Sequence, residues 1–491
     1  MQSVKEEIEK LFQQYNNAAI TAIDKLPQAG SERHYFRLYT ANKTFIATYG
    51  ANLKENEAFI YFSKHFKKKQ LATPEIFCIN AEKNIYIQED FGDISLLNKL
   101  EEKGFTDEVY GLYKKSLQQL VELQVKGHEG LDYKKCLTNA TFGKQAIMAD
   151  LLYFKYYFLD ALRQPYDKQK LIDDFEALSN YLAHTEYKFF MFRDFQSRNI
   201  MVNPSPGEGQ GWAVHFIDYQ GGMKGAPQYD VASLLWQAKA NLPDDWKQRL
   251  LEDYMDAFEK IVQEPIDKDS FRSQYNGYIL IRLLQVLGAY GFRGLFERKA
   301  HFLTSIPHAL QNLKWFVDNQ NVGIALPEFK KVLEICISEE VIQEFTPVQA
   351  TAETPLVVTI NSFSYKKGIP ADISENGGGY VFDMRGILNP GRIEAYKTQS
   401  GLDKPVMDFL EQQTDMPVFL NGVFSTIDIS VSDYIKRGFK SLMINFGCTG
   451  GQHRSVYAAE ALARHLRNKF KVKIALTHTN KDNWVRDAPN P

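Results

Sequence analysis

The sequence is short of cysteine, of long apolar runs and of net charge, and each shortage excludes a class of protein. Its four cysteines, Cys78, Cys136, Cys336 and Cys448, lie far apart, so neither a disulfide framework nor a paired zinc site is indicated. No apolar run of about 18 residues occurs and the N-terminal segment MQSVKEEIEKLFQQY has no apolar signal core, so we expect no membrane contact and a cytoplasmic protein. The formal net charge of -2 gives no overall attraction to nucleic acid.

What is present is the composition of a globular protein large enough for several cores. Hydrophobic residues make up 44% and charged residues 24% of the 491 residues. Ordinary domain sizes then predict roughly two to four domains.

A small, mostly β region precedes a larger helical region. FRLYTANKTFIATYG predicts two strands around the turn TANK, and TPEIFCIN and NIYIQEDFG predict two more. From about residue 106 the pattern is helical, interrupted by the short strand patterns IMVN and WAVHFID. We therefore expect a two-lobed, protein-kinase-like fold over residues 1–345, with an N lobe at about 15–95 and a C lobe at about 96–345.

The remainder of the chain has a different pattern. QEFTPVQATAETP is poor in large apolar residues and predicts a linker at 346–355. After it, LVVTINS, YVFDMRG and SLMINFG are each followed by a loop and a longer amphipathic piece. This alternation predicts a compact α/β domain with a mostly parallel sheet over residues 356–491, and a multi-domain α+β and α/β protein as a whole.

The strongest chemical pattern of the first domain is FRDFQSRNIMV followed by HFIDYQGG. Phosphoryl transfer needs a carboxylate to orient the acceptor hydroxyl, and oxygen ligands for the Mg²⁺ that bridges the phosphates. Asp194, Asn199 and Asp218, the last at the end of a predicted strand, provide one base and two oxygen ligands at the spacing of a kinase catalytic loop.

These motifs resemble the aminoglycoside phosphotransferase family of small-molecule kinases over roughly residues 15–325. RDFQSRNIM, IDYQ and YDVASLL are most similar to its branch of anomeric sugar kinases, which phosphorylate N-acetylmuramate or N-acetylglucosamine in cell-wall recycling. The resemblance implies ATP and Mg²⁺ as cofactors, Asp194 as catalytic base, Asn199 and Asp218 as Mg²⁺ ligands, and Asp230 as a structural carboxylate.

The same resemblance implies where ATP binds. IQEDFGD would be the hinge, with backbone groups of Glu89, Asp90 and Phe91 facing the adenine. QAGSERHYFRL would be the loop over the phosphates, where Gly30 and Ser31 allow close approach of the backbone.

Two positions depart from the kinase pattern. Phe192 stands where kinases usually have histidine, and FIATYG has no lysine where the third strand is expected to provide one. Arg33, Arg37 or Lys43 is left to supply that charge, and the sequence does not choose among them. The aromatic run YFKYYF either lines a sugar pocket or packs in the core.

In the second domain, the strand pattern SLMINF leads into GCTGGQHRS and then into an amphipathic helix with Ala459, Leu462, Ala463 and Leu466 on one face. A glycine-bearing loop at a helix N-terminus presents backbone N–H groups and the positive end of the helix dipole to an anion. The candidate phosphate-binding residues are Cys448, Thr449, Gly450, Gly451, Gln452, His453, Arg454 and Ser455.

This domain resembles the C-terminal domain of the RNase adapter protein RapZ. VVTINSFSYKKGIP, VFDMRGILNPGRIEAYKTQSGLD and GCTGGQHRSV carry the resemblance, whereas the P-loop pattern GxxxxGK[ST] of the other half of RapZ is absent. In that family the domain binds small regulatory RNA and is linked to sensing glucosamine 6-phosphate. The resemblance implies a phosphate or phosphosugar at the loop, with Asp383 and Arg385 beside it, and RNA as a further partner.

The spacing of Cys448, Arg454 and Ser455 is also that of cysteine-dependent phosphatases. In that alternative, loop amides and Arg454 stabilise a Cys448 thiolate as nucleophile, with Asp383 as general acid. Gly447, however, stands where those enzymes usually have histidine.

The sequence therefore predicts an ATP- and Mg²⁺-dependent kinase of an amino sugar, fused to a domain that binds a phosphorylated metabolite. The alternative is a degenerate kinase scaffold whose C-terminal domain binds RNA or a protein. The oligomeric state and the acceptor hydroxyl are left open.

Overall fold

The computed structural model describes residues 2–26, 33–204, 211–297, 300–372, 374 and 378–485. The chain divides into two compact units. Unit 1 comprises Met1–Ala289 and His308–Ile337, and unit 2 comprises Tyr290–Pro307 and Ser338–Pro491.

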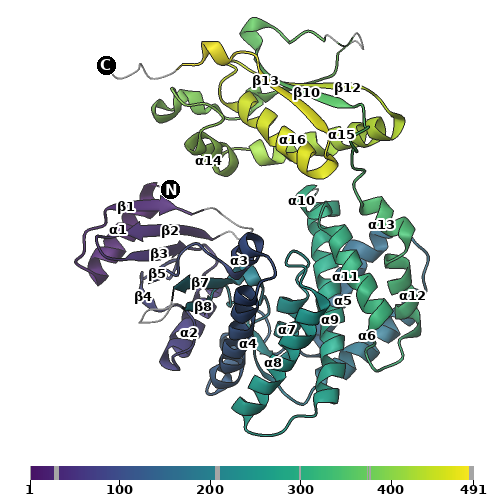
Figure 1. Ribbon diagram of the computed structural model, residues 1–491. Helices are drawn as coiled ribbons and strands as arrows, with labels where there is room; N and C mark the ends of the chain where they lie inside the picture. The colour runs from purple at the N-terminus through teal and green to yellow at the C-terminus, as the bar shows by residue number, and fades with distance from the viewer. Residues whose placement is uncertain are drawn as a thin grey trace. The chain divides into compact units, whose positions relative to one another are not determined.

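Unit 1 begins with an antiparallel five-stranded sheet in the order β1-β2-β3-β5-β4, drawn in purple in Figure 1. Its elements are α1 (Gln2–Tyr15), β1 (Ala22–Lys25), β2 (His34–Tyr39), β3 (Thr44–Tyr49), α2 (Leu53–Lys68), β4 (Ile76–Ile79) and β5 (Ile85–Glu89). Phe12 of α1 packs with Phe36 and Phe45 in the core of this lobe. The predicted hairpin around TANK is present as the β2–β3 pair.

The larger lobe of unit 1 is helical. Its helices are α3 (Leu96–Lys103), α4 (Asp107–His128), α5 (Lys144–Phe154), α6 (Lys168–Ala183), α7 (Gln228–Leu235), α8 (Asp244–Val262), α9 (Lys268–Tyr290), α11 (Ile306–Asn319) and α12 (Pro327–Cys336). Two short antiparallel pairs accompany them: β6 (Phe189–Met191) with β9 (Met223–Gly225), and β7 (Ile200–Pro204) with β8 (Trp212–Phe216). The predicted arrangement of a small β lobe and a large helical lobe is confirmed.

Helix α9, together with the helical turns that follow it to Phe296, is long and apolar enough to cross a membrane by length and composition. In this structure 56% of that apolar window is buried inside the protein, as in the core helix of a globular domain. It also carries a buried arginine, Arg282, which reaches the candidate catalytic loop.

Unit 2 contains a four-stranded sheet in the order β11-β12-β10-β13, and all three strand pairs are parallel. Its elements are α10 (Ala300–Leu303), α13 (Glu339–Phe345), β10 (Val357–Ser364), β11 (Tyr380–Asp383), α14 (Lys404–Gln413), α15 (Met416–Arg437), β12 (Ser441–Cys448), α16 (Arg454–Phe470) and β13 (Lys473–His478). The predicted mostly parallel sheet is confirmed, while β13 was not among the predicted strands. The predicted apolar face of α16 is buried in the core of this sheet.

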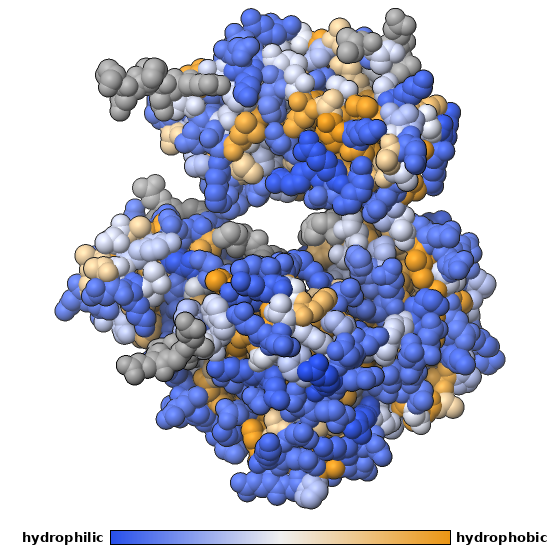
Figure 2. Space-filling view, in the orientation of Figure 1, coloured by the Kyte–Doolittle hydropathy of each residue, from blue (hydrophilic) through white to orange (hydrophobic). Residues whose placement is uncertain are grey.

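The surfaces of the units differ in the view of Figure 2. Unit 1 shows a largely hydrophilic surface, whereas apolar residues gather on the visible face of unit 2. Helix α15 contributes to the exposed apolar surface of unit 2 with Val418 and Ile429, whose side chains are 72% and 73% exposed.

Candidate functional site

The loop that carries the candidate catalytic base is held in place by a buried carboxylate on α7. Asp230 accepts hydrogen bonds from the backbone N–H groups of Phe192 (2.8 Å) and Arg193 (3.0 Å) and from Gln124 Nε2 (2.9 Å). Burial raises the pKa of Asp230 to about 6, although these donors oppose the shift. The three donors fix the backbone that leads into Asp194, and Arg193 has a positive φ of 79°, a conformation that such pinning maintains.

Asp194 lies in a cluster of cations and amides. Its carboxylate accepts hydrogen bonds from Arg282 Nη2 and Arg198 Nη2, both at 3.1 Å, and from the side chain of Gln196. Burial raises the pKa of Asp194, but the charges of Arg282 and Arg198 and the hydrogen bonds to its carboxylate together lower it by more, so the net shift is downward. Asp194 is therefore ionised at neutral pH and can accept a proton or a hydrogen bond from an acceptor hydroxyl.

The two expected metal ligands come from the segment that carries Asp194 and from the segment that follows β8. Asn199 is buried and directs its Nδ2 to the Asp194 carbonyl oxygen at 2.9 Å. Asp218 follows β8 with a positive φ of 72°, and its Oδ1 accepts hydrogen bonds from Arg33 Nη2 (2.8 Å) and Gln220 Nε2 (2.9 Å). Ile217 N donates to Asn199 O at 3.0 Å, so the segments that carry Asn199 and Asp218 are joined directly.

Phe192, which replaces the usual histidine, is completely buried in an aromatic cluster. Its ring lies 5.2 Å from Phe195, 6.3 Å from Phe216 and 5.9 Å from Tyr219, each in an edge-to-face arrangement. In this chain an apolar ring packs where a histidine would form polar contacts, and Asp230 supplies the polar attachment of the loop.

Of the residues expected to bind the nucleotide, some lie outside the described part of the chain and others have partners elsewhere. Gly30 and Ser31 lie outside the described residues. Arg37 on β2 forms ion pairs with Asp90 and Asp93, each at 2.7 Å, so its charge is committed to the hinge. Lys43 lies over the rings of Phe45 and Phe77, at 5.4 and 5.0 Å.

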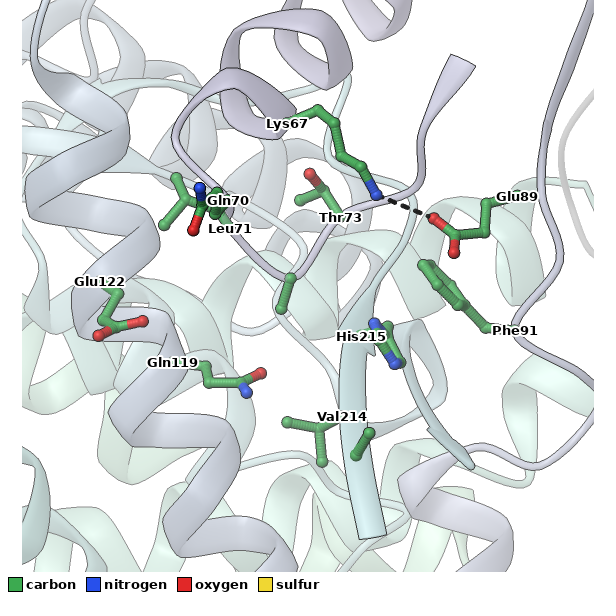
Figure 3. Close-up of a pocket in the computed structure, with 12 residues that line it drawn as sticks. Lys67, Gln70, Leu71, Thr73, Glu89, Phe91, Gln119, Glu122, Val214 and His215 are labelled. Atoms are coloured by element: carbon green, nitrogen blue, oxygen red, sulfur yellow. Dashed lines mark hydrogen bonds and ion pairs between the residues drawn. The ribbon is translucent and has the colours of Figure 1, made fainter. Parts of the chain in front are cut away.

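Glu89 and Phe91 of the hinge line a pocket of about 280 Å³, shown in Figure 3. Lys67 from the end of α2 pairs with Glu89 at 3.3 Å, and Phe91 stacks on His215 of β8 at 4.0 Å. Gln119 and Glu122 of α4 close the other side. Because none of the candidate catalytic or metal-binding residues lines it, this pocket is distinct from the Asp194 cluster.

In unit 2, the candidate phosphate loop follows β12 at the carboxyl end of the parallel sheet. Ser364 at the end of β10 is in register with Cys448, and Asp383 at the end of β11 is in register with Gly447. The chain leaves the adjacent strands β10 and β12 toward opposite edges of the sheet, to β11 and β13 respectively. Such a switch in strand order is where open α/β sheets bind ligands.

Contacts within the loop are short and numerous. Gly451 N donates to Cys448 Sγ at 3.2 Å, and Ser455 Oγ lies 3.2 Å from the same sulfur. Ser364 Oγ donates to the Thr449 carbonyl at 2.7 Å, and Asn480 Nδ2 donates to the Gly450 carbonyl at 2.7 Å. The carbonyl oxygens of the loop are thereby turned toward the protein.

Glycine is required at two positions of this loop. Gly451 has a positive φ of 62°, and a Cβ there would lie 2.9 Å from Ser364 N. A Cβ on Gly447 would lie 2.4 Å from the Phe363 ring and 2.5 Å from the Tyr365 ring. The histidine that phosphatases have before the cysteine therefore cannot fit at position 447 without displacing these rings.

Arg454, at the start of α16, is buried without a carboxylate partner among the ion pairs of the described residues. Its Nη1 donates to the carbonyl oxygens of Ile387 (2.6 Å) and Arg385 (3.1 Å), and its Nε is buried with no hydrogen-bond partner in the described part of the chain. Burial lowers the pKa of Arg454. A charge held in this way favours an incoming anion.

Gln452 and His453 connect this loop to neighbouring segments. Gln452 Nε2 donates to Gln399 O at 2.7 Å, and its Oε1 accepts from Val485 N at 2.9 Å. His453 Nε2 lies 2.9 Å from the Tyr396 carbonyl, so Nε2 must carry the proton, and burial lowers the pKa of this histidine. His453 is therefore neutral at pH 7.

Asp383 and Arg385 lie near the loop but are occupied with each other. Their ion pair is 2.6 Å long, and Arg385 also lies over the Tyr365 ring at 4.0 Å. The hydrogen bond from Arg385 lowers the pKa of Asp383. This makes Asp383 a poor general acid for the phosphatase alternative.

Sequence reasoning did not identify Glu55, Arg282, Asn480 or Trp484 as part of either site. Glu55 pairs with Arg33 and Arg282 with Asp194, while Trp484 Nε1 donates to the Gly451 carbonyl at 2.8 Å. A signal existed for Arg282, because it is a single charge within the apolar stretch GYILIRLLQVLGAY. No local sequence pattern singled out Glu55, Asn480 or Trp484.

Comparison with known proteins supports both halves of this description. Residues 25–267 match the model of the phosphotransferase enzyme family, and residues 356–482 match the model of the RapZ C-terminal domain. The two predicted resemblances are thus confirmed at the level of these families, and the anomeric sugar kinase branch stays a prediction.

Individual relatives cover only parts of the chain. A nucleotide-binding protein of Endomicrobium trichonymphae is 37% identical over 140 residues, which are 28% of this chain and 47% of that protein. One from Glaesserella parasuis serovar 5 is 37% identical over 141 residues, 29% of this chain and 47% of that protein. The chain thus spans about half the length of the curated relatives it matches.

Solved structures with similarity include kinases of small molecules. Choline kinase LicA from Streptococcus pneumoniae has 13% identity and a TM-score of 0.40, covering 65% of this chain and 98% of its own. Plasmodium vivax ethanolamine kinase has 13% identity and a TM-score of 0.43, covering 62% of this chain and 84% of its own. The spectinomycin phosphotransferase APH(9)-Ia, solved with ADP and spectinomycin, has 14% identity and a TM-score of 0.38, covering 68% and 98%.

Proposed function

We propose that this chain, which joins a phosphotransferase-family domain to a RapZ C-terminal domain, is an ATP- and Mg²⁺-dependent kinase of an amino sugar that also binds a phosphorylated metabolite. The observation that carries the kinase proposal is the cluster of Asp194, Asn199 and Asp218. An ionised carboxylate with a lowered pKa lies beside Asn199, and a backbone hydrogen bond joins the Asn199 segment to the one that carries Asp218; a base and two oxygen ligands are the set that phosphoryl transfer requires.

The donor set fits Mg²⁺. This ion is commonly held by one or two protein oxygen ligands together with substrate phosphates and water, rather than by a protein cage. Among the described residues no group of three or more His, Cys, Asp or Glu side chains is placed to hold a metal. Asn199 and Asp218 would therefore hold the ion jointly with the nucleotide, where it would neutralise phosphate charge.

The proposal of an amino-sugar acceptor rests on the catalytic-loop motifs and on the aromatic run YFKYYF, which begins at the end of α5. Phe154 and Phe158 are completely buried and therefore pack in the core, whereas Tyr156 is 57% exposed. Asp150 of the same helix pairs with Arg193 at 2.8 Å, beside the base. An exposed ring close to the helix that contacts the catalytic loop can stack on a pyranose.

In unit 2 the proposed ligand is a phosphosugar such as glucosamine 6-phosphate. Support comes from the incompletely satisfied Arg454 guanidinium, the N-terminus of the 17-residue helix α16 and the carboxyl-end position of the loop. For RNA the observations are weaker, because Arg437 and Lys469 of the basic segments pair with Asp433 and Asp428.

A phosphate-transfer screen tests the kinase proposal. The full chain is incubated with Mg²⁺ and γ-labelled ATP, with N-acetylmuramate or N-acetylglucosamine as acceptor, and with choline, ethanolamine and spectinomycin as competing acceptor classes. We expect label on an N-acetylhexosamine, in an acid-labile bond if the anomeric hydroxyl is the acceptor. Transfer only to an amino alcohol or aminoglycoside would replace the proposed substrate class, and transfer to no acceptor would favour the degenerate scaffold.

A further inference from the structure

We propose that Arg33 takes the place of the strand lysine that this chain lacks, and that Glu55 of α2 positions it beside Asp218 to bind the ATP phosphates. This inference rests on the kinase function proposed above. It concerns a residue just before β2 rather than one on β3, where the lysine of kinases stands.

The partners of Arg33 are those that the strand lysine has in kinases. In kinases the strand lysine contacts the nucleotide phosphates and is held by a glutamate of the first large helix, near the aspartate that binds the metal. Arg33 Nη2 lies 3.3 Å from Glu55 Oε1 and 2.8 Å from Asp218 Oδ1. Glu55 lies in the first turn of α2, the helix that follows β3. One guanidinium thus contacts both the helix carboxylate and the proposed metal ligand.

Arg33 also lies close to the residues that flank Thr48 of β3. Thr48 is completely buried on β3 and pairs in register with Tyr35 of β2 and Tyr86 of β5. The Arg33 guanidinium carbon lies 5.7 Å from the centre of the Tyr35 ring, and its charge lowers the pKa of Tyr86 against the larger, raising effect of burial. The guanidinium therefore lies, from a residue just before the adjacent strand β2, close to the neighbours of position 48.

A glycine next to β3 leaves space for the Arg33 side chain. Gly50 directly follows β3, and a Cβ on it would lie 3.2 Å from Arg33 Cγ and 2.5 Å from Asn56 Oδ1. Asn56 Nδ2 in turn donates to the Gly50 carbonyl at 2.8 Å. The absence of a side chain at position 50 leaves a path for the Arg33 stem, whose side chain is only 4% exposed.

The other two candidate cations are used elsewhere. Arg37 is bound to Asp90 and Asp93 at the hinge, and Lys43 lies over Phe45 and Phe77. Arginine carries five N–H donors in a planar fork, so one edge can contact carboxylates while another contacts phosphate oxygens. Burial by itself lowers the pKa of Arg33, but neighbouring tyrosines and carboxylates raise it above its ordinary value, and the group stays charged.

The test is Mg·ADP binding by the full chain, measured by isothermal titration calorimetry, with Arg33→Met and Arg33→Lys. We expect Arg33→Met to weaken binding by about tenfold or more, because a charge-assisted contact to phosphate is lost, and Arg33→Lys to recover part of that loss. The matched control is Lys83→Met, which removes an exposed ion pair of 2.7 Å to Glu57 on the same helix and should leave binding within about twofold.

Glu55→Gln is the second variant, because it keeps Arg33 and Asp218 and removes the charge of the helix carboxylate that contacts Arg33. It should weaken Mg·ADP binding less than Arg33→Met, and the double variant should lose less than the sum of the two effects, since the residues act through one contact. If the wild-type chain binds Mg·ADP while Arg33→Met or, should that variant not fold, Glu55→Gln binds it equally well, the inference is overturned. If the wild-type chain itself binds no Mg·ADP, the kinase proposal fails, and this role of Arg33 fails with it.

Discussion

The buried arginines of the two units have different partners, and the difference indicates which kind of ligand each site is built for. In unit 1, Arg33 and Arg282 form ion pairs with carboxylates that are themselves candidate site residues. In unit 2, Arg454 donates to the carbonyl oxygens of Arg385 and Ile387 and has no carboxylate among the ion pairs of the described residues; burial lowers its pKa, while the nearby Cys448 and Asp383 oppose that shift. In the first site, carboxylates of the site itself neutralise the arginine charges. In the second site, the Arg454 charge has no carboxylate among the ion pairs of the described residues and can attract an anion.

This difference follows from what each site must bind. A kinase site holds Mg²⁺ and phosphates together, so acidic and basic side chains have to lie within a few ångströms of each other. A site for a lone phosphorylated metabolite needs only donors, and a carboxylate partner for Arg454 would compete with the ligand. The carboxylate nearest in register, Asp383, is instead paired with Arg385.

The largest expected effect is that of replacing Asp194, the candidate catalytic base of unit 1. Asp194→Asn keeps the size of the side chain but not its charge, and we expect kcat for phosphate transfer to fall by about 10²- to 10⁴-fold with little change in Mg·ADP affinity. Asp253→Asn is the matched control, because Asp253 pairs with Lys114 at 2.7 Å on the helical lobe, away from the loop. If Asp194→Asn transfers phosphate with the wild-type kcat, Asp194 is not the catalytic base.

A smaller effect is expected from removing the uncompensated charge of unit 2. Arg454→Met should weaken binding of glucosamine 6-phosphate by about tenfold to a hundredfold, because a charge-assisted contact to phosphate is lost, and should leave phosphate transfer to the acceptor unchanged. Arg437→Met, which removes an exposed arginine paired with Asp433, is the control. Calorimetry with glucosamine 6-phosphate, glucosamine and inorganic phosphate separates the contributions of the phosphate and the sugar. Equal binding of glucosamine 6-phosphate by Arg454→Met and the wild type would contradict the proposal that the Arg454 charge attracts an anion.

The smallest effect is expected at the cysteine. Cys448 is buried and its sulfur accepts the Gly451 N–H, a contact that a serine oxygen can also make. Cys448→Ser should therefore change glucosamine 6-phosphate binding by less than about threefold. The phosphatase alternative predicts instead that the wild type releases phosphate from an aryl phosphate and that Cys448→Ser abolishes the release, so an aryl phosphate assay decides between them.

Much of the fold was predictable because its signals are local. Alternating apolar patterns around TANK and the apolar face of Ala459, Leu462, Ala463 and Leu466 identified strands and a helix that the structure contains. Strand β13 was missed because KIALTH is short and contains only two large apolar residues, Ile474 and Leu476, although its residues alternate between exposed and partly buried at an edge of the sheet. Both family resemblances also rested on contiguous motifs, and both were confirmed.

By itself, the sequence determined which residue types are available: Asp194, Asn199 and Asp218 at kinase spacing, a glycine-bearing loop before a helix, and no lysine on the third strand. Only the tertiary structure decided how they are used. It brought Arg33 to Asp218 across 185 positions, placed Arg282 of α9 against Asp194, and left Arg454 among carbonyl oxygens. Charge pairing depends on distances of a few ångströms between segments far apart in sequence, and no local pattern encodes those distances.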